Sequence, residues 1–111
     1  MSLPLIDALS FEALQAHAGA DFVLALVETF SEEAHQLVAE LRQAAALGAA
    51  ERYETAAHSL KGNAATFGAA RLAEQARRLE WSGPGDDAAA VEALAVELAL
   101  TLQALRALAR V

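Results

Sequence analysis

A histidine, a lysine and a glycine lie in one stretch of this chain with a spacing that could support phosphoryl chemistry. His58, Lys61 and Gly62 occupy positions i, i+3 and i+4, so in a helix they fall on the same face. An imidazole is a nucleophile, an ammonium group pairs with phosphoryl oxygens, and a glycine leaves room beside both. The spacing therefore predicts a spot that accepts a phosphoryl group and lets another protein come close to deliver it.

The direction of the His58 side chain follows from helical geometry. Successive residues of a helix turn by roughly 100°. Ala56 and Leu60 fall nearly opposite His58, and they belong to the apolar side that must face a core. We therefore expect His58 to point to solvent, where the alternative to a functional role is an ordinary surface histidine.

Gly62 needs an explanation, because a glycine inside a helix costs about 1 kcal/mol relative to alanine. The chain uses alanine freely, so the glycine indicates either close packing of a neighbouring helix or clearance for an approaching partner. On the outward face we favour clearance. Lys61 is the only lysine of the chain, and its alternative role is a solvated surface charge.

Glu80 is expected at the height of His58. His58 lies ten residues before Gly68 and Glu80 twelve after it, so a sharp turn at Gly68 would place the two at similar levels of neighbouring helices. A carboxylate there can accept a hydrogen bond from one ring N–H and leave the other nitrogen free to attack phosphorus. The alternative is a plain surface glutamate.

The elements that must hold these residues are helices. Apolar residues recur at three- and four-residue steps, without the alternation of a strand. The first long helix should turn the following residues inward: Val23, Val27, Phe30, Ala34, Leu37, Leu41 and Ala45. The expected helices run from an Asp7 or Ser10 cap to Leu14, from an Asp21 cap to Gly48, from Ala50 to Phe67, from Gly68 to the Ser82–Gly85 turn, and from an Asp86 or Asp87 cap onward.

Four long helices with short connections predict an all-α fold. We expect an antiparallel up-down-up-down four-helix bundle with a short additional N-terminal helix. The chain of 111 residues suits one domain, spanning 1–111, with the core of the bundle at about 21–110.

Composition excludes several classes of function. The net charge of −7 argues against nucleic-acid binding. No apolar run reaches the roughly 18 residues of a membrane span, and no signal peptide is visible. Cysteine is absent, so thiolate metal sites are excluded. We expect a cytoplasmic protein that is a monomer and contacts neither membrane nor nucleic acid.

The motif Ala57-His58-x-Leu60-Lys61-Gly62, followed by Gly68 and Leu79-Glu80, resembles the histidine-containing phosphotransfer (HPt) domain family of phosphorelays. The resemblance extends over most of the chain. Asp21-Phe22 and Phe30-Ser31-Glu32-Glu33 look like the second helix of the family, whereas Asn63 replaces the small residue common there.

The resemblance implies a role for each site residue. His58 would be phosphorylated on Nε2, Lys61 would steady the phosphoryl group, Gly62 would clear the approach and Glu80 would hold the ring. The domain would have no kinase or ATP-binding machinery and no cofactor of its own. The implied partners are response-regulator receiver domains, which supply Mg²⁺, or a hybrid sensor histidine kinase.

The docking surface is expected on the outward parts of the first three helices. We name Phe22 and Leu26 as its apolar candidates, although Phe22 could instead belong to the core.

Three further hypotheses stay open. The phosphotransfer domain of chemotaxis-type kinases carries Glu at the position of Glu80, so the chain could be such a kinase's substrate domain. It could instead be a helical interaction module without phosphate chemistry. A metal enzyme fits least, because His17, His35 and His58 lack the spacing of metal ligands.

Overall fold

The structure is a computed structural model that describes residues 2–85 and 88–110. Within these residues the chain forms five α-helices and no strand, which confirms the predicted all-helical class. The helices are α1 (Ala8–Ala18), α2 (Ala20–Leu47), α3 (Ala50–Thr66), α4 (Ala70–Ser82) and α5 (Ala89–Ala109).

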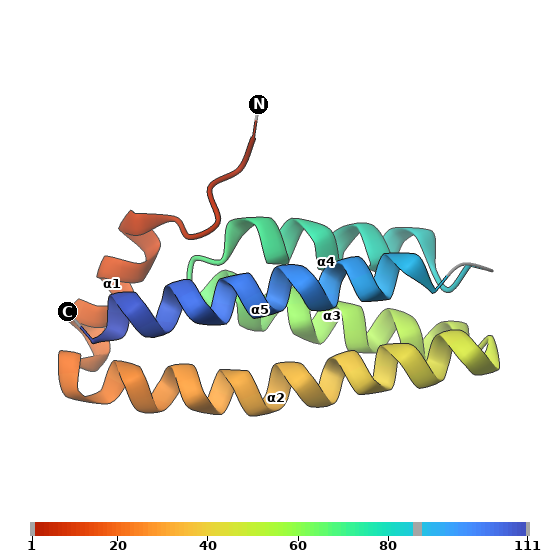
Figure 1. Ribbon diagram of the computed structural model, residues 1–111, viewed down its shortest axis with the longest axis horizontal. Coiled ribbons are helices and arrows are strands. Elements are labelled where there is room, and N and C mark those ends of the chain that lie inside the picture. Colours follow the sequence, from red (N-terminus) through yellow and green to blue (C-terminus); the bar gives the residue numbers. More distant parts are fainter. Residues whose placement is uncertain (1, 86–87, 111) are drawn as a thin grey trace.

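The four longer helices lie lengthwise beside one another, and α1 lies at one end of them (Figure 1). Helix α3 packs against both α2 and α4, and α5 also packs against α2 and α4. Each of the four therefore turns one side toward a shared interior and leaves the other side for solvent. None of the helices in the described ranges is long and apolar enough to cross a membrane.

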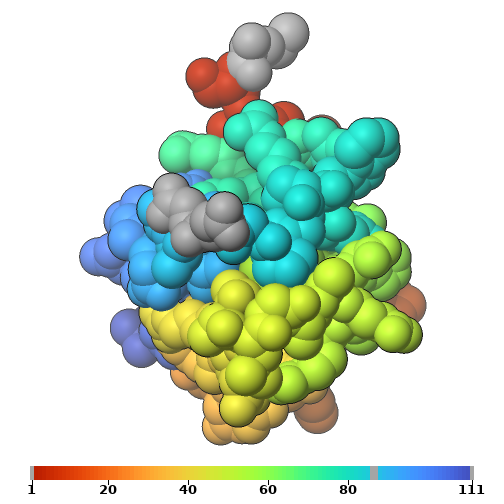
Figure 2. All heavy atoms as spheres, turned by 90° about the vertical axis from the view of Figure 1, so that its right-hand side faces the viewer, coloured from red at the N-terminus to blue at the C-terminus, as the bar shows by residue number. Residues whose placement is uncertain are grey.

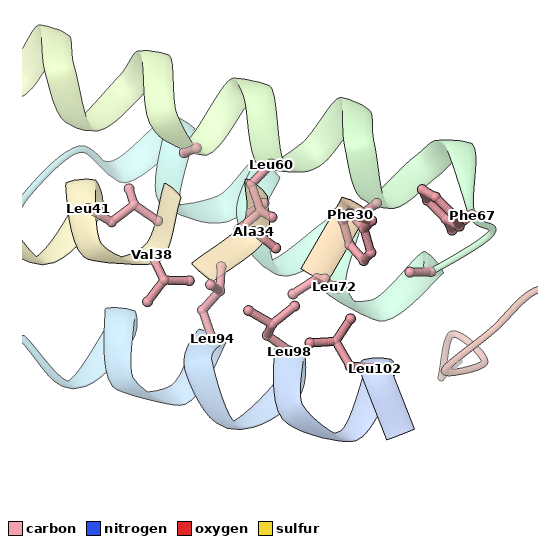
Figure 3. Close-up of a cluster of buried hydrophobic side chains, with 14 of the residues drawn as sticks. Phe30, Ala34, Val38, Leu41, Leu60, Phe67, Leu72, Leu94, Leu98 and Leu102 are labelled. Atoms are coloured by element: carbon pink, nitrogen blue, oxygen red, sulfur yellow. The ribbon is translucent and has the colours of Figure 1, made fainter. Parts of the chain in front are cut away.

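The core is aliphatic for most of its length, as the low content of aromatic residues predicts. Leucine, valine and alanine side chains from α2, α3, α4 and α5 meet in its centre (Figure 3). Near the α3–α4 corner the rings of Phe30 and Phe67 stack with centroids 4.8 Å apart. Leu60 is fully buried in this core, so the opposite side of α3 must face outward.

The beginning of the chain differs from the prediction. Helix α1 continues to Ala18 instead of stopping at Leu14, and Asp7 rather than Ser10 caps it by accepting a hydrogen bond from the Leu9 N–H. Gly19, at φ 92°, separates α1 from α2. Because α2 begins at Ala20, Asp21 lies in its first turn and is not the predicted cap.

The buried stripe of α2 also shifts along the helix. Val38 and Ala44 are buried, whereas the predicted Leu37 and Ala45 are only partly buried. Helix α2 has 28 residues and contacts both α3 and α5, so its inward side is wider than one stripe. The predicted end at Gly48 is confirmed, with φ 65°. The predicted caps Asp86 and Asp87 lie outside the described residues.

The corner between α3 and α4 is closed by the N-terminal segment. Gly68 has φ 71°, and its carbonyl accepts a hydrogen bond of 2.6 Å from the Asp7 N–H. A Cβ atom added to Gly68 would lie 2.8 Å from the Asp7 carbonyl oxygen, closer than two such atoms can approach. Only glycine suits this corner, which fixes how α3 and α4 fold back on each other.

Candidate functional site

His58 lies in the middle of α3 on the side away from the core. Its side chain is 66% exposed, whereas Ala57 and Leu60, on the core side of the same helix, are fully buried. This orientation agrees with the prediction from helical spacing. The imidazole is therefore available to another molecule.

The ring of His58 is held from α4. Its Nδ1 lies 2.8 Å from Oε2 of Glu80, across the α3–α4 contact. A carboxylate only accepts hydrogen bonds, so Nδ1 carries the proton and donates it to Glu80. The lone pair of the neutral ring then lies on Nε2. The structure thus brings His58 and Glu80 into contact, as their distances in sequence from Gly68 predict.

Glu80 also binds Lys61. The Lys61 ammonium group donates a hydrogen bond of 2.8 Å to Oε1, while the Glu80 side chain is 18% exposed. The pKa of Glu80 is lowered from 4.5, first by the hydrogen bond from Lys61 and then by that from His58, against the partial loss of hydration. Near neutral pH the group is therefore a carboxylate shared by two donors.

The ammonium group of Lys61 is paired, unlike the solvated surface charge that was the alternative interpretation of this residue. Its side chain is 33% exposed and paired with Glu80. It remains on the same helical face as His58, three residues away. A phosphoryl group on His58 would therefore compete with Glu80 for this ammonium group.

Gly62 faces open space. A Cβ atom added there would have no neighbouring atom of the rest of the described chain within 4 Å. Close packing of another helix, the alternative explanation for this glycine, is therefore excluded within residues 2–85 and 88–110. The open space at Gly62 is compatible with the other explanation, clearance for a partner that approaches His58.

The predicted apolar docking residues lie away from His58. Two hydrogen bonds set the level of α3 along α2: Asn63 donates to Glu33 at 3.3 Å, and Arg52 donates to Glu40 at 2.7 Å. Because His58 lies between Arg52 and Asn63 in α3, it lies level with the part of α2 between Glu33 and Glu40. Phe22 is 64% exposed but lies roughly 16 Å or more beyond that level at 1.5 Å per residue. Leu26, also on α2, is partly buried against the core.

Among residues 2–85 and 88–110, neither His17 nor His35 has a hydrogen bond to a carboxylate. His35 is exposed and its Nδ1–H donates to the Ser31 carbonyl of its own helix at 2.7 Å. The described residues contain no group of three or more His, Cys, Asp or Glu side chains placed to hold a metal ion.

Sequence reasoning missed Trp81, the residue after Glu80. Its side chain is 82% exposed and lines a surface hollow together with Glu54 and Lys61. The signal was present: Trp81 is the only tryptophan and lies off the inward stripe of Leu72, Ala76 and Leu79.

The family model described as Hpt domain matches residues 25–108 of this chain. That range covers α3 and α4 with His58, Lys61, Gly62 and Glu80. No curated protein and no solved structure matches the chain significantly.

Proposed function

This chain belongs to the Hpt domain family, and we propose on that basis that it is a phosphorelay intermediary. Hpt domains are phosphocarrier modules of two-component signalling and work with receiver domains and kinases. For this chain, we assign His58 as the residue that accepts a phosphoryl group from a receiver aspartyl phosphate and passes it to another receiver aspartate.

The bond between His58 Nδ1 and Glu80 is the observation that carries the assignment. It leaves the Nε2 lone pair to attack phosphorus. As the N–P bond forms, the P–O bond to the aspartate breaks and the aspartate leaves as a carboxylate. The proton stays on Nδ1, so the ring becomes positively charged, and Glu80 lies where it stabilises that charge.

Lys61 and Gly62 serve the same step. The Lys61 ammonium group, held near the ring by Glu80, can pair with the oxygens of the phosphoryl group once it arrives. The open space at Gly62 lets the partner bring its aspartate within bonding distance of Nε2. We propose that the partner receiver supplies Mg²⁺ through its own carboxylates.

The scaffold that we propose for this role is an antiparallel up-down-up-down bundle formed by one domain over residues 1–111. Its support is the alternating direction of α2, α3, α4 and α5, whose colours follow the chain back and forth in Figure 1. Helix α1 is then an addition at the end where Gly68 lies.

The test is phosphorylation of the protein by phosphorylated receivers. Wild type should acquire acid-labile, base-stable phosphate, and His58→Gln should acquire none. His35→Gln is the matched control, because His35 is also exposed and also has Nδ1 occupied. It should be labelled like wild type.

Label that persists on His58→Gln would refute the assignment. Faster labelling from ATP by a separate kinase domain would instead assign the chain as the substrate domain of a chemotaxis-type kinase. A full biological output from His58→Gln would favour an interaction module without phosphate chemistry.

A further inference from the structure

Trp81 is a large, strongly exposed apolar side chain next to the proposed phosphorylation site. The residue before it, Glu80, binds both His58 and Lys61. An indole that is 82% exposed gains nothing from the core of its own protein. Tryptophan is also one of the residue types, with tyrosine and arginine, that are enriched among the side chains that dominate binding energy at protein interfaces.

Two adjoining hollows connect Trp81 to His58. One is lined by Ala50, Glu54, Lys61, Glu80, Trp81, Ser82 and Gly83. The other is lined by Glu51, Glu54, Thr55, His58, Ser59 and Glu80. Glu54 and Glu80 belong to both, so the surface from His58 to Trp81 is continuous. Figure 2 shows the end of the molecule where the start of α3 and the end of α4 lie together.

This surface carries negative charge that the chain does not neutralise. Lys61, which lines one of the two hollows, carries a positive charge but is already paired with Glu80. The side chains of Glu51 and Glu54 make no hydrogen bond or ion pair with any of the residues that the structure describes. An acidic rim beside an exposed indole is complementary to a side chain that combines an apolar stem with a positive charge.

We propose that Trp81 and Glu54 form a docking subsite for the receiver domain, and that it takes an arginine or lysine of that domain. The stem of the incoming side chain lies on the indole and its cationic head faces Glu54. This inference rests on the proposed function and names how the partner of that same site is held. A receiver held there keeps its active aspartate beside His58, because the two hollows adjoin.

The position of Phe22, the other strongly exposed aromatic residue, does not suit this role. Phe22 lies on α2 near α1, whereas Glu80, adjacent to Trp81, contacts His58 directly. It therefore serves as the control: another exposed aromatic ring on the same protein, away from the hollows.

The experiment measures receiver binding and phosphotransfer with the full chain. Because Trp81 is the only tryptophan, its fluorescence should shift to shorter wavelength when a cognate receiver covers it. Trp81→Ala should raise the receiver concentration needed for half-maximal transfer by about tenfold or more, as hot-spot residues do, while the rate at saturation stays close to wild type. Phe22→Ala should leave both quantities unchanged.

Glu54→Gln should also weaken binding, and it should reduce the dependence of binding on salt, because a screened charge pair has been removed. Wild-type half-saturation in both Trp81→Ala and Glu54→Gln would overturn the docking subsite. A saturating rate that falls in Trp81→Ala without any change in half-saturation would overturn it as well. Labelling of His58 tests the proposed function separately, since a protein that is phosphorylated on His58 but binds independently of Trp81 refutes only the subsite.

Discussion

The middle of α3 and the corner that ends it each contain a glycine, and the two glycines have opposite surroundings. At Gly62 the backbone is helical and nothing lies within 4 Å of an added Cβ atom. At Gly68 the backbone has φ 71°, and the same atom would meet the Asp7 carbonyl oxygen at 2.8 Å. The fold requires glycine at the corner but not in the middle of the helix.

The difference separates a glycine that the packing of the described residues explains from one that it does not explain. A residue that costs stability and fills no steric need inside its own chain points to a requirement from outside. Gly62 is such a residue, and it lies one turn from His58. Gly68 acts on the site indirectly, by setting the register between the helix with His58 and the helix with Glu80.

The largest effect is expected from a bulky side chain in the middle of α3. Gly62→Leu should slow phosphotransfer by about a hundredfold, because a displaced partner no longer aligns its aspartate with Nε2. The same variant should be more stable than wild type by about 1 kcal/mol, since leucine is the better helix former. Urea unfolding and transfer kinetics on one preparation check both values.

Gly62→Ala is the graded control for this prediction. It should gain the same stability and lose much less of the transfer rate, because a methyl group occupies little of the open space. Wild-type rates in Gly62→Leu would show that clearance is not the purpose of this glycine.

The next effect concerns the corner. Gly68→Ala should lower the free energy of unfolding by about 2–3 kcal/mol. Alanine is strained in the left-handed backbone conformation of this residue, and its Cβ atom would also collide with the Asp7 carbonyl oxygen. Gly48→Ala is matched in backbone, with φ 65°, but has no atom within 4 Å of the added Cβ. It should lose only about 1 kcal/mol. Equal losses in the two variants would mean that the contact with Asp7 contributes nothing.

A smaller effect is expected from the carboxylate that links the two helices. Glu80→Gln keeps an oxygen that accepts from Nδ1–H but removes the negative charge, so transfer at pH 7 should slow by about tenfold. His35→Gln provides the baseline for a histidine change outside the site.

The pH dependence of stability tests the same carboxylate. The hydrogen bond from Lys61, followed by that from His58, lowers the pKa of Glu80 in the folded protein below 4.5. Its contribution to stability is therefore complete above pH 4.5 and is lost as the pH falls through the lowered value. The difference in melting temperature between wild type and Glu80→Gln should not shrink between pH 7 and 5, and it should shrink in stronger acid. A difference that already shrinks between pH 7 and 6 would contradict the lowered pKa.

Much of the fold was readable from the sequence because it depends on local patterns. In α3 the inward side follows helical spacing: Ala56 and Leu60, which the sequence places opposite His58, are both buried. The predicted Asp21 cap was wrong. Gly19 is both the C-cap of α1 and the N-cap of α2, and the spacing of apolar residues does not show that two helices share one capping residue. The burial of Val38 and Ala44 was not predicted, because α2 packs against two helices and the spacing of apolar residues does not reveal the second one.

The candidate site was predictable to the extent that it depends on a turn and a helical face. The approach of His58 to Glu80 followed from their distances in sequence to Gly68. The link from Lys61 to Glu80 did not, because it depends on side-chain conformations across two helices. Trp81 was overlooked because the reason to consider it as a docking residue is its place in a hollow that adjoins the one beside His58. These hollows form only when α3 and α4 pack together.

The bond from Asp7 to the carbonyl of Gly68 has a consequence for how this protein tolerates cleavage. The side chain of Asp7 caps α1, and its backbone N–H donates a hydrogen bond to the corner between α3 and α4. A protease that removes residues 1–7 would leave every atom of His58, Lys61, Gly62 and Glu80 in the chain. It would remove the hydrogen bond at Gly68, so we expect His58 and Glu80 to be aligned less strictly and the proposed phosphotransfer to slow, in a clipped chain that still looks helical by circular dichroism.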